Sequence, residues 1–196
     1  MKKLASTLPN MILSLGVICV IAATLLGGMY MITKEPIERQ MKMQQQQAIK
    51  DVAPSFDNDP EKDKFEVKED GNIFTVYPAF SDGKLVGAAV EGYSMNGFAG
   101  QITVICGFNL DGSVRDYRVI QQAETPGLGT KMETWFRDPQ GSRSIIGKNP
   151  ETFSFYVVKD PGGQVDGITA ATISSRAFLE ILRNAFDAYK QYINSL

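Results

Sequence analysis

The N-terminal part of the chain contains a run of 22 residues, Met11 to Ile32, without a charged side chain. A mostly apolar helix of this length can span the hydrocarbon core of a bilayer. A cleavable signal peptide would have a shorter apolar core followed by a small-x-small cleavage site, and the sequence LGGMYMITKEP offers no clean site of that kind. The pattern therefore predicts an uncleaved transmembrane helix.

A polar segment with four consecutive glutamines and several acidic residues follows the apolar run. A short amphipathic helix is possible over residues 37–52, because four apolar residues recur there at helical spacing. These are Ile37, Met41, Ile49 and Val52. The stretch from Pro54 to Pro60 then predicts a break. We favour the simpler interpretation, a solvated polar stalk over residues 34–64.

Short alternating runs rich in aromatic and β-branched residues come next, and this pattern is typical of strands. Two turn sequences, Ser81-Asp82-Gly83 and Asp111-Gly112, separate such runs, and an Asp-Gly pair between alternating runs is a strong hairpin signal. The predicted strands cover residues 72–80, 84–94, 100–110, 113–122 and 152–159.

Two helices complete the predicted elements. Thr130 is the predicted N-cap of a short helix over residues 130–138. The segment from Ile173 to Asn194 shows the helical period over its whole length, so a long C-terminal helix is expected there. Its apolar face consists of Ile173, Ala177, Phe178, Ile181, Leu182, Ala185, Tyr189 and Ile193.

These elements predict an α+β fold in which a single N-terminal transmembrane helix precedes an antiparallel sheet covered by the long C-terminal helix. We divide the chain into a tip with the transmembrane helix (residues 1–33), the polar stalk (residues 34–64) and the sheet domain (residues 65–196).

Composition excludes several kinds of chemistry. The chain has no histidine, which removes the commonest metal ligand and general base, and its formal net charge of -2 gives no electrostatic reason to expect nucleic acid as a partner. Cys19 lies in the apolar run and Cys106 in a predicted strand, so we expect neither a disulfide framework nor a metal site.

The most suggestive stretch is DGITAATISS, residues 166–175, at the start of the predicted C-terminal helix. A helix start exposes unpaired N–H groups and the positive end of the helix dipole, so it binds phosphate well. Threonine and serine are also ordinary N-caps, each worth about 1 kcal/mol. These facts alone favour a simple helix cap.

A second stretch, ETPGLGTKMETWF at residues 124–136, combines a Thr-Pro-Gly turn with a glycine on either side of Leu128. Such a loop would let the backbone and one apolar side chain lie against a flat ring. By itself the pattern is weak, because many strings of this type are plain turns.

The Asp-x-x-Thr-x-Ala-Thr pattern at residues 166–172 resembles the flavinylation motif of FMN-binding domains, and ETPGLG at residues 124–129 resembles the second signature of that family. The resemblance implies that the hydroxyl of Thr172 carries FMN through a phosphoester, placed there by a separate flavin transferase that uses FAD and a metal ion. It also implies a set of cofactor-binding residues within residues 124–129 and 166–175, with Asp166 holding the turn or serving the transferase. The set is Thr172, Asp166, Gly167, Thr169, Ala171, Ser175, Glu124, Thr125, Gly127, Leu128 and Gly129.

A membrane anchor followed by these two motifs is similar to the G subunits of Rnf complexes. That resemblance implies an electron-carrier flavoprotein, with no complete active site of its own, among the other subunits of a membrane ion-translocating ferredoxin:NAD oxidoreductase. One alternative is the C-type flavin subunit of a Na+-translocating NADH:quinone reductase, although that subunit usually has a longer chain. The other is a membrane-anchored assembly module without cofactor, in which Thr172 is only an N-cap.

Charge alone leaves the orientation in the membrane open. Lys2 and Lys3 precede the apolar run, whereas four basic residues follow it. The positive-inside rule, which places the more basic flank in the cytoplasm, is weak when a large domain follows the helix. The four are Lys34, Arg39, Lys42 and Lys50. The resemblance implies a cytoplasmic N-terminus and a domain on the outer, periplasmic side of the cell (inner) membrane.

Overall fold

The computed structural model of the chain describes residues 7–69 and 71–196, so Lys2 and Lys3 of the predicted tip lie outside the described residues. The chain forms two compact units, one up to Gln44 and one from Gln45 to Leu196. Residues 45–64, which the sequence pattern assigns to the stalk, thus belong to the same compact unit as the sheet.

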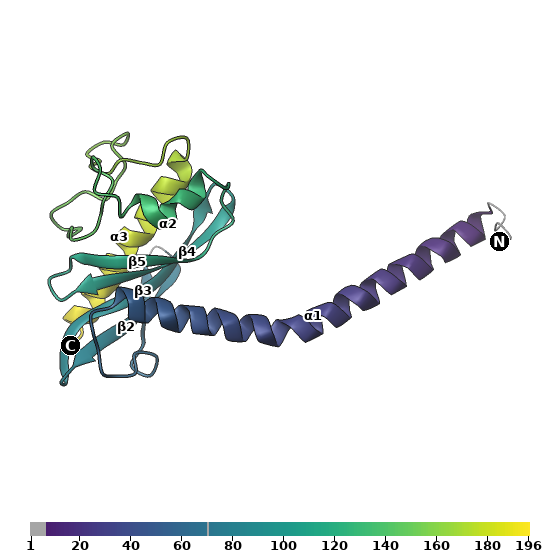
Figure 1. Ribbon diagram of the computed structural model, residues 1–196, viewed down its shortest axis with the longest axis horizontal. Coiled ribbons are helices and arrows are strands. Elements are labelled where there is room, and N and C mark those ends of the chain that lie inside the picture. Colours follow the sequence, from purple (N-terminus) through teal and green to yellow (C-terminus); the bar gives the residue numbers. More distant parts are fainter. Residues whose placement is uncertain (1–6, 70) are drawn as a thin grey trace. The chain divides into compact units, whose positions relative to one another are not determined.

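Helix α1 runs without interruption from Leu8 to Val52 and includes the predicted transmembrane segment (Figure 1). By length and composition it contains a stretch able to cross a membrane, with mean hydropathy 2.4 and no burial against the rest of the described chain. Residues 37–52, for which we favoured a solvated stalk, are helical. Ion pairs of the i,i+4 type such as Arg39–Glu35, with a nitrogen–oxygen distance of 2.6 Å, support the helix there.

Five strands form one antiparallel sheet in the order β1-β2-β3-β4-β5, so every strand pairs with its neighbours in sequence (Figure 1). Asp82 and Gly83 both have positive φ, 50° and 72°, which closes the β2–β3 hairpin as the Asp-Gly signal predicts. The strands are β1 (Phe65–Glu69), β2 (Asn72–Ser81), β3 (Lys84–Gly97), β4 (Gly100–Asn109) and β5 (Val114–Gln121).

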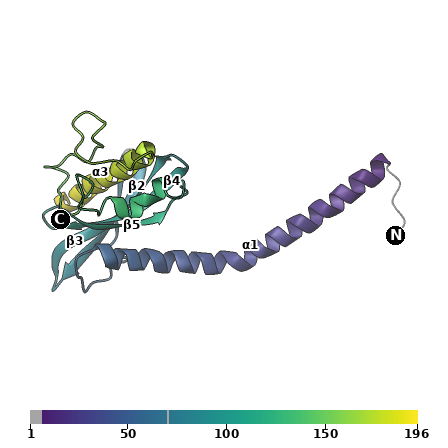
Figure 2. The same ribbon diagram turned by 45° about the horizontal axis from the view of Figure 1, so that its top comes forward.

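The two faces of the sheet are covered by different helices. Helix α3, Thr172–Asn194, packs its apolar stripe on one face, and Figure 2 shows it crossing the strands. The last two turns of α1 cover the other face, where Ile49 and Val52 are buried in a second, smaller cluster. Gly107 of β4 permits this close approach, because a Cβ at that position would overlap the backbone carbonyl of Val52. The predicted α+β class, with an antiparallel sheet and a long C-terminal helix, is confirmed.

The predicted strand over residues 152–159 is wrong. This segment is irregular, and it contributes only an isolated parallel bridge between Val157 and Val165. Its alternating apolar residues are nevertheless buried, because Phe155 and Val157 join the core beneath α3. The guanidinium of Arg183 donates a hydrogen bond to the carbonyl of Phe155 at 2.5 Å, so the loop backbone is held by the helix instead of by a neighbouring strand.

The predicted short helix over residues 130–138 is shorter in the structure. A 3-10 turn at Gly129–Lys131 leads into α2, Met132–Trp135. Thr130 is not an N-cap, because its hydroxyl instead accepts a hydrogen bond from the N–H of Gly127 at 3.0 Å. This bond closes the preceding loop on itself.

Candidate functional site

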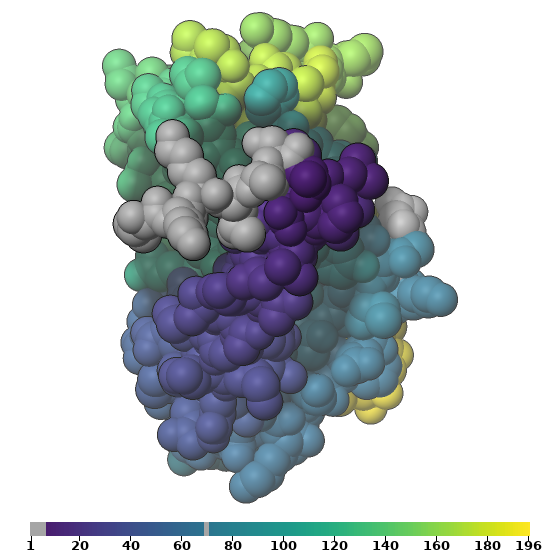
Figure 3. All heavy atoms as spheres, turned by 90° about the vertical axis from the view of Figure 1, so that its right-hand side faces the viewer, coloured from purple at the N-terminus to yellow at the C-terminus, as the bar shows by residue number. Residues whose placement is uncertain are grey.

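The two motifs singled out from the sequence, 48 positions apart at Glu124 and Thr172, meet at one pocket of the sheet domain. The cavity measures about 410 Å³, which is within the range of small-molecule sites. Figure 3 shows this end of the domain, with the yellow-green start of α3 beside the green segment around residue 130. The pocket is lined by Phe98, Glu124, Thr125, Leu128, Gly129, Ala170, Ala171, Thr172, Ile173 and Ser174.

The loop from Glu124 to Gly129 forms one wall of the pocket. Its turn is closed by a hydrogen bond from the N–H of Leu128 to the carbonyl of Thr125, at 3.1 Å. Gly127 adopts φ +75°, which glycine reaches without strain. The turn leaves the Leu128 side chain partly exposed at the pocket. This exposure is needed if Leu128 is to lie against the flat ring of a ligand.

The start of α3 forms the opposite wall. Ala171 occupies the N-cap position, and no side chain caps the helix among the described residues. Ser175 fastens the turn, since its hydroxyl donates to the carbonyl of Ala171 at 2.9 Å and accepts from the N–H of Ile168 at 2.9 Å. Thr172 is therefore the first residue of the helix and not its cap. Its hydroxyl is not engaged in capping, and within the described chain the helix start offers its first-turn N–H groups to a ligand.

Backbone strain is stored next to this helix start. Ala170 has φ +63°, a left-handed conformation that costs a residue with a Cβ about 1–2 kcal/mol. The hydrogen bond from the N–H of Ala171 to the carbonyl of Ile168, at 3.0 Å, helps to hold this turn. Strained residues of this kind cluster at functional sites, where the surrounding structure over-determines them.

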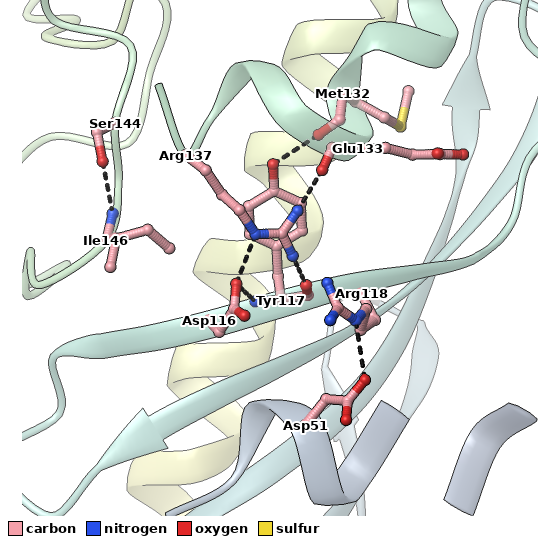
Figure 4. Close-up of polar contacts among 9 residues, drawn as sticks. All are labelled: Asp51, Asp116, Tyr117, Arg118, Met132, Glu133, Arg137, Ser144 and Ile146. Carbon is pink, nitrogen blue, oxygen red and sulfur yellow. Dashed lines mark hydrogen bonds and ion pairs between the residues drawn. The ribbon is translucent and has the colours of Figure 1, made fainter. Parts of the chain in front are cut away.

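A polar network after the pocket loop fastens α2 to β5 (Figure 4). The hydroxyl of Tyr117 donates to the carbonyl of Met132 at 2.6 Å, and burial raises the pKa of this hydroxyl far above its usual value of 10. Arg137 lies over the Tyr117 ring and donates to Asp116 Oδ1 at 2.7 Å, as well as to the carbonyls of Tyr117 and Glu133. The network fixes the segment that follows the pocket loop.

Asp166 is not among the residues that line the pocket. Its Oδ2 accepts a hydrogen bond from the N–H of Ser142 at 2.8 Å, and its carbonyl accepts one from Nε1 of Trp135 at 2.8 Å. It therefore holds the loop before α3 against α2. Four other predicted site residues also stand outside the pocket lining: Gly127, Gly167, Thr169 and Ser175.

Further along α3, the guanidinium of Arg176 binds both carboxylate oxygens of Asp160. This hydrogen bonding lowers the pKa of Asp160 below its usual value. The pair ties the loop after residue 152 to the first turns of the helix.

Sequence reasoning missed four residues of the pocket: Phe98, Ala170, Ile173 and Ser174. Phe98 lies at the tip of the β3–β4 hairpin, where the strand register shifts between Ser94 and Gly97. Phe98 is large, apolar and 66% exposed, and it lines the pocket. No local pattern reveals it, because the hairpin tip reaches the pocket only in the folded chain.

The residues present fit a phosphorylated, flat aromatic ligand. The uncapped start of α3 and the Thr172 hydroxyl suit a phosphate group, and Phe98, Leu128 and Ile173 offer apolar surface for a ring. A ligand with both features, such as FMN, could be held by residues on both walls.

Comparison of the sequence with known protein families also points to an FMN-binding domain. Residues 97–187 match the model of the FMN-binding domain family, and residues 13–52 match that of the RnfG N-terminal region. Three similar proteins each bear the name of the G subunit of an ion-translocating oxidoreductase complex. The one from Aliivibrio fischeri is 31% identical over 97% of this chain and 94% of its own length. The one from Erwinia tasmaniensis is 32% identical over 93% and 88%, and that from Haemophilus influenzae 31% over 83% and 81%.

Proposed function

The chain belongs to the family of G subunits of ion-translocating oxidoreductase complexes, and from this premise we propose that it is the FMN-carrying electron-transfer subunit of such a membrane complex. A flavin accepts one or two electrons, so the sheet domain would pass electrons between redox centres of the other subunits, in an Rnf-type exchange between ferredoxin and NAD. The protein sets the flavin's surroundings and excludes competing reactions, while the flavin supplies the redox chemistry.

We further propose that FMN is attached to Thr172 through a phosphoester. The observation that carries this proposal is that Thr172 lines the pocket at the start of α3 without serving as its cap. Its hydroxyl oxygen would bond to the FMN phosphorus of FAD, with loss of the hydroxyl proton and release of AMP. A separate flavin transferase, which this chain would meet as a protein substrate, would catalyse the transfer.

The other predicted cofactor residues take roles that their positions support. Thr125, Leu128 and Gly129 would border the ring, whereas Ala171 and the N–H groups after it would border the phosphate. Asp166 would act indirectly, by holding the turn before the helix. A covalent tether prevents loss of the cofactor on a side of the membrane where free FMN is scarce.

We also propose how the chain is oriented in the membrane. The stretch of α1 able to cross a membrane would anchor the chain in the cell membrane with a cytoplasmic N-terminus and an external domain. A protease added to spheroplasts, whose outer membrane has been opened, should then digest the sheet domain, and protection of the domain would refute this orientation.

The test of flavin attachment uses the full-length chain co-expressed with a flavin transferase. The denatured protein is examined on a gel for flavin fluorescence under ultraviolet light. We expect a fluorescent band for the unsubstituted chain and none for Thr172→Ala. Thr152→Ala is the matched control, because Thr152 is an exposed threonine outside both motifs and outside the pocket lining, so its band should remain. A band that persists in Thr172→Ala refutes the attachment site, and proteins that co-purify with the chain identify its complex.

A further inference from the structure

Glu124 is a charged residue on the wall of the pocket, yet only 4% of it is exposed. Both of its carboxylate oxygens accept hydrogen bonds from other segments. Oε1 accepts one from the N–H of Ala99 at 3.2 Å, and Oε2 accepts one from the hydroxyl of Ser174 at 2.6 Å. One side chain therefore connects the pocket loop, the β3–β4 hairpin tip and the first turn of α3.

Two glycines, Gly97 and Gly129, leave room for this carboxylate because they have no side chain. A Cβ on Gly97 would lie 2.8 Å from Oε1 of Glu124, and a Cβ on Gly129 would lie 2.6 Å from its Oε2. Both separations are shorter than the contacts that Cβ atoms make in proteins. The carboxylate is thus built into the pocket wall between the two glycines.

The charge of Glu124 has no cationic partner among the described residues, because none of the ion pairs found there includes it. The two hydrogen bonds and the nearby N-terminal end of α3 stabilise the carboxylate instead. A buried charge that is not paired acts strongly on its neighbours, since little water screens it.

We propose that Glu124 is a positioning residue that holds the pocket together and, through its buried negative charge, lowers the reduction potential of the bound flavin. This inference rests on the proposed function, because it needs FMN in the pocket. Uptake of two electrons and one proton leaves a flavin one negative charge richer. A fixed negative charge on the pocket wall disfavours that change, so reduction requires a stronger electron donor.

Glu124→Gln separates the charge from the shape. The glutamine can keep both links, because its carbonyl oxygen can accept from Ala99 while its amide group donates to the Ser174 hydroxyl. Glu133→Gln is the matched control. It also removes one negative charge, from an exposed side chain of α2 outside the pocket lining.

The measurement is the midpoint potential of FMN bound to the full-length chain in detergent, by reduction against a dye of known potential. At the midpoint potential of the unsubstituted protein, we expect the ratio of reduced to oxidised flavin to rise at least tenfold in Glu124→Gln. For a two-electron couple this is a positive shift of about 30 mV. Glu133→Gln should leave the potential unchanged, and an equally unchanged potential in Glu124→Gln would overturn the role of the charge.

The positioning role is tested with Glu124→Ala, which breaks both links. The fluorescence anisotropy of the bound flavin should fall in Glu124→Ala but not in Glu124→Gln, and equal anisotropy in both would overturn this role. If the unsubstituted chain carries no flavin, the proposed function fails and this inference with it. If flavin is bound at an unaltered potential, only this inference fails.

Discussion

Gly129 gives a quantitative test of how tightly the pocket wall is built. In Gly129→Ala the new methyl group would lie 2.6 Å from Oε2 of Glu124, 2.7 Å from its Cβ and 2.8 Å from the hydroxyl oxygen of Ser174. The neighbours are the buried carboxylate and a buried hydroxyl that already hydrogen-bond to each other, so they have little freedom to move. The substitution should therefore separate them.

Three contributions determine how much Gly129→Ala changes the free energy of unfolding: two destabilise the folded state and one stabilises it. Overpacking a well-packed site costs about 1–3 kcal/mol. Loss of the hydrogen bond between Ser174 and the charged Glu124 adds about 1.5–3 kcal/mol. Replacement of glycine by alanine returns about 0.4–1 kcal/mol by restricting the unfolded chain. The net loss in the free energy of unfolding is then about 2–5 kcal/mol.

Urea denaturation of the full-length chain in detergent measures this loss. With a dependence of about 2 kcal/mol per molar urea, the midpoint of Gly129→Ala should fall by roughly 1–2.5 M. Gly127→Ala is the matched control, because it places the same methyl group in the same loop in open space. Its cost is limited to the strain of a left-handed alanine, about 1–2 kcal/mol.

The two variants should also differ at the site. Gly129→Ala should bind flavin less firmly, seen as a lower fluorescence anisotropy, whereas Gly127→Ala keeps the contact between Glu124 and Ser174. If Gly129→Ala unfolds at the urea concentration of the unsubstituted protein, the carboxylate is not confined as the structure has it. Such a result would refute the tight packing of this wall.

Two further outcomes are expected. Thr172→Ser keeps the hydroxyl but loses the methyl group, so it should still show a fluorescent flavin band on a denaturing gel, weaker than that of threonine; a band of equal strength would mean that the methyl has no positioning role. Burial and the charge of Asp111 raise the pKa of Tyr189 from 10.0 to about 12, and its hydroxyl donates to the carbonyl of Asn109. Because the folded state keeps this proton longer than the unfolded state, the free energy of unfolding should fall as the pH rises from 10 to 12. Tyr189→Phe should make that fall shallower in denaturation curves, and an identical slope would contradict the assignment.

Strong local periodicity made most of the fold predictable from the sequence. The long apolar stripe placed the C-terminal helix within one residue of its observed start at Thr172, and the Asp-Gly turn at residues 82–83 located a hairpin. Strand β1, Phe65–Glu69, was missed because it is a short edge strand with three charged residues. The strand over residues 152–159 was predicted wrongly, because alternation reports burial and a loop can also bury Phe155 and Val157.

The candidate site was predictable only in part. Family motifs marked the segments of Glu124 and Thr172, and the structure brings both to one pocket. Their roles in cofactor attachment stay predictions. The place of Phe98 in the pocket and the hydrogen bond from Ser174 to Glu124 could not be predicted from the sequence. Both depend on a hairpin tip and a helix start that meet only after folding.

The close contact between the last turns of α1 and the sheet limits where the chain can be divided. Ile49 and Val52 fill the apolar surface formed by Tyr77, Ala79 and Ile105. A soluble fragment that starts at residue 65 would expose this surface to water and should aggregate. One that starts at Gln45 keeps it covered, so the natural place to separate the domain for secretion or crystallisation lies inside a helix.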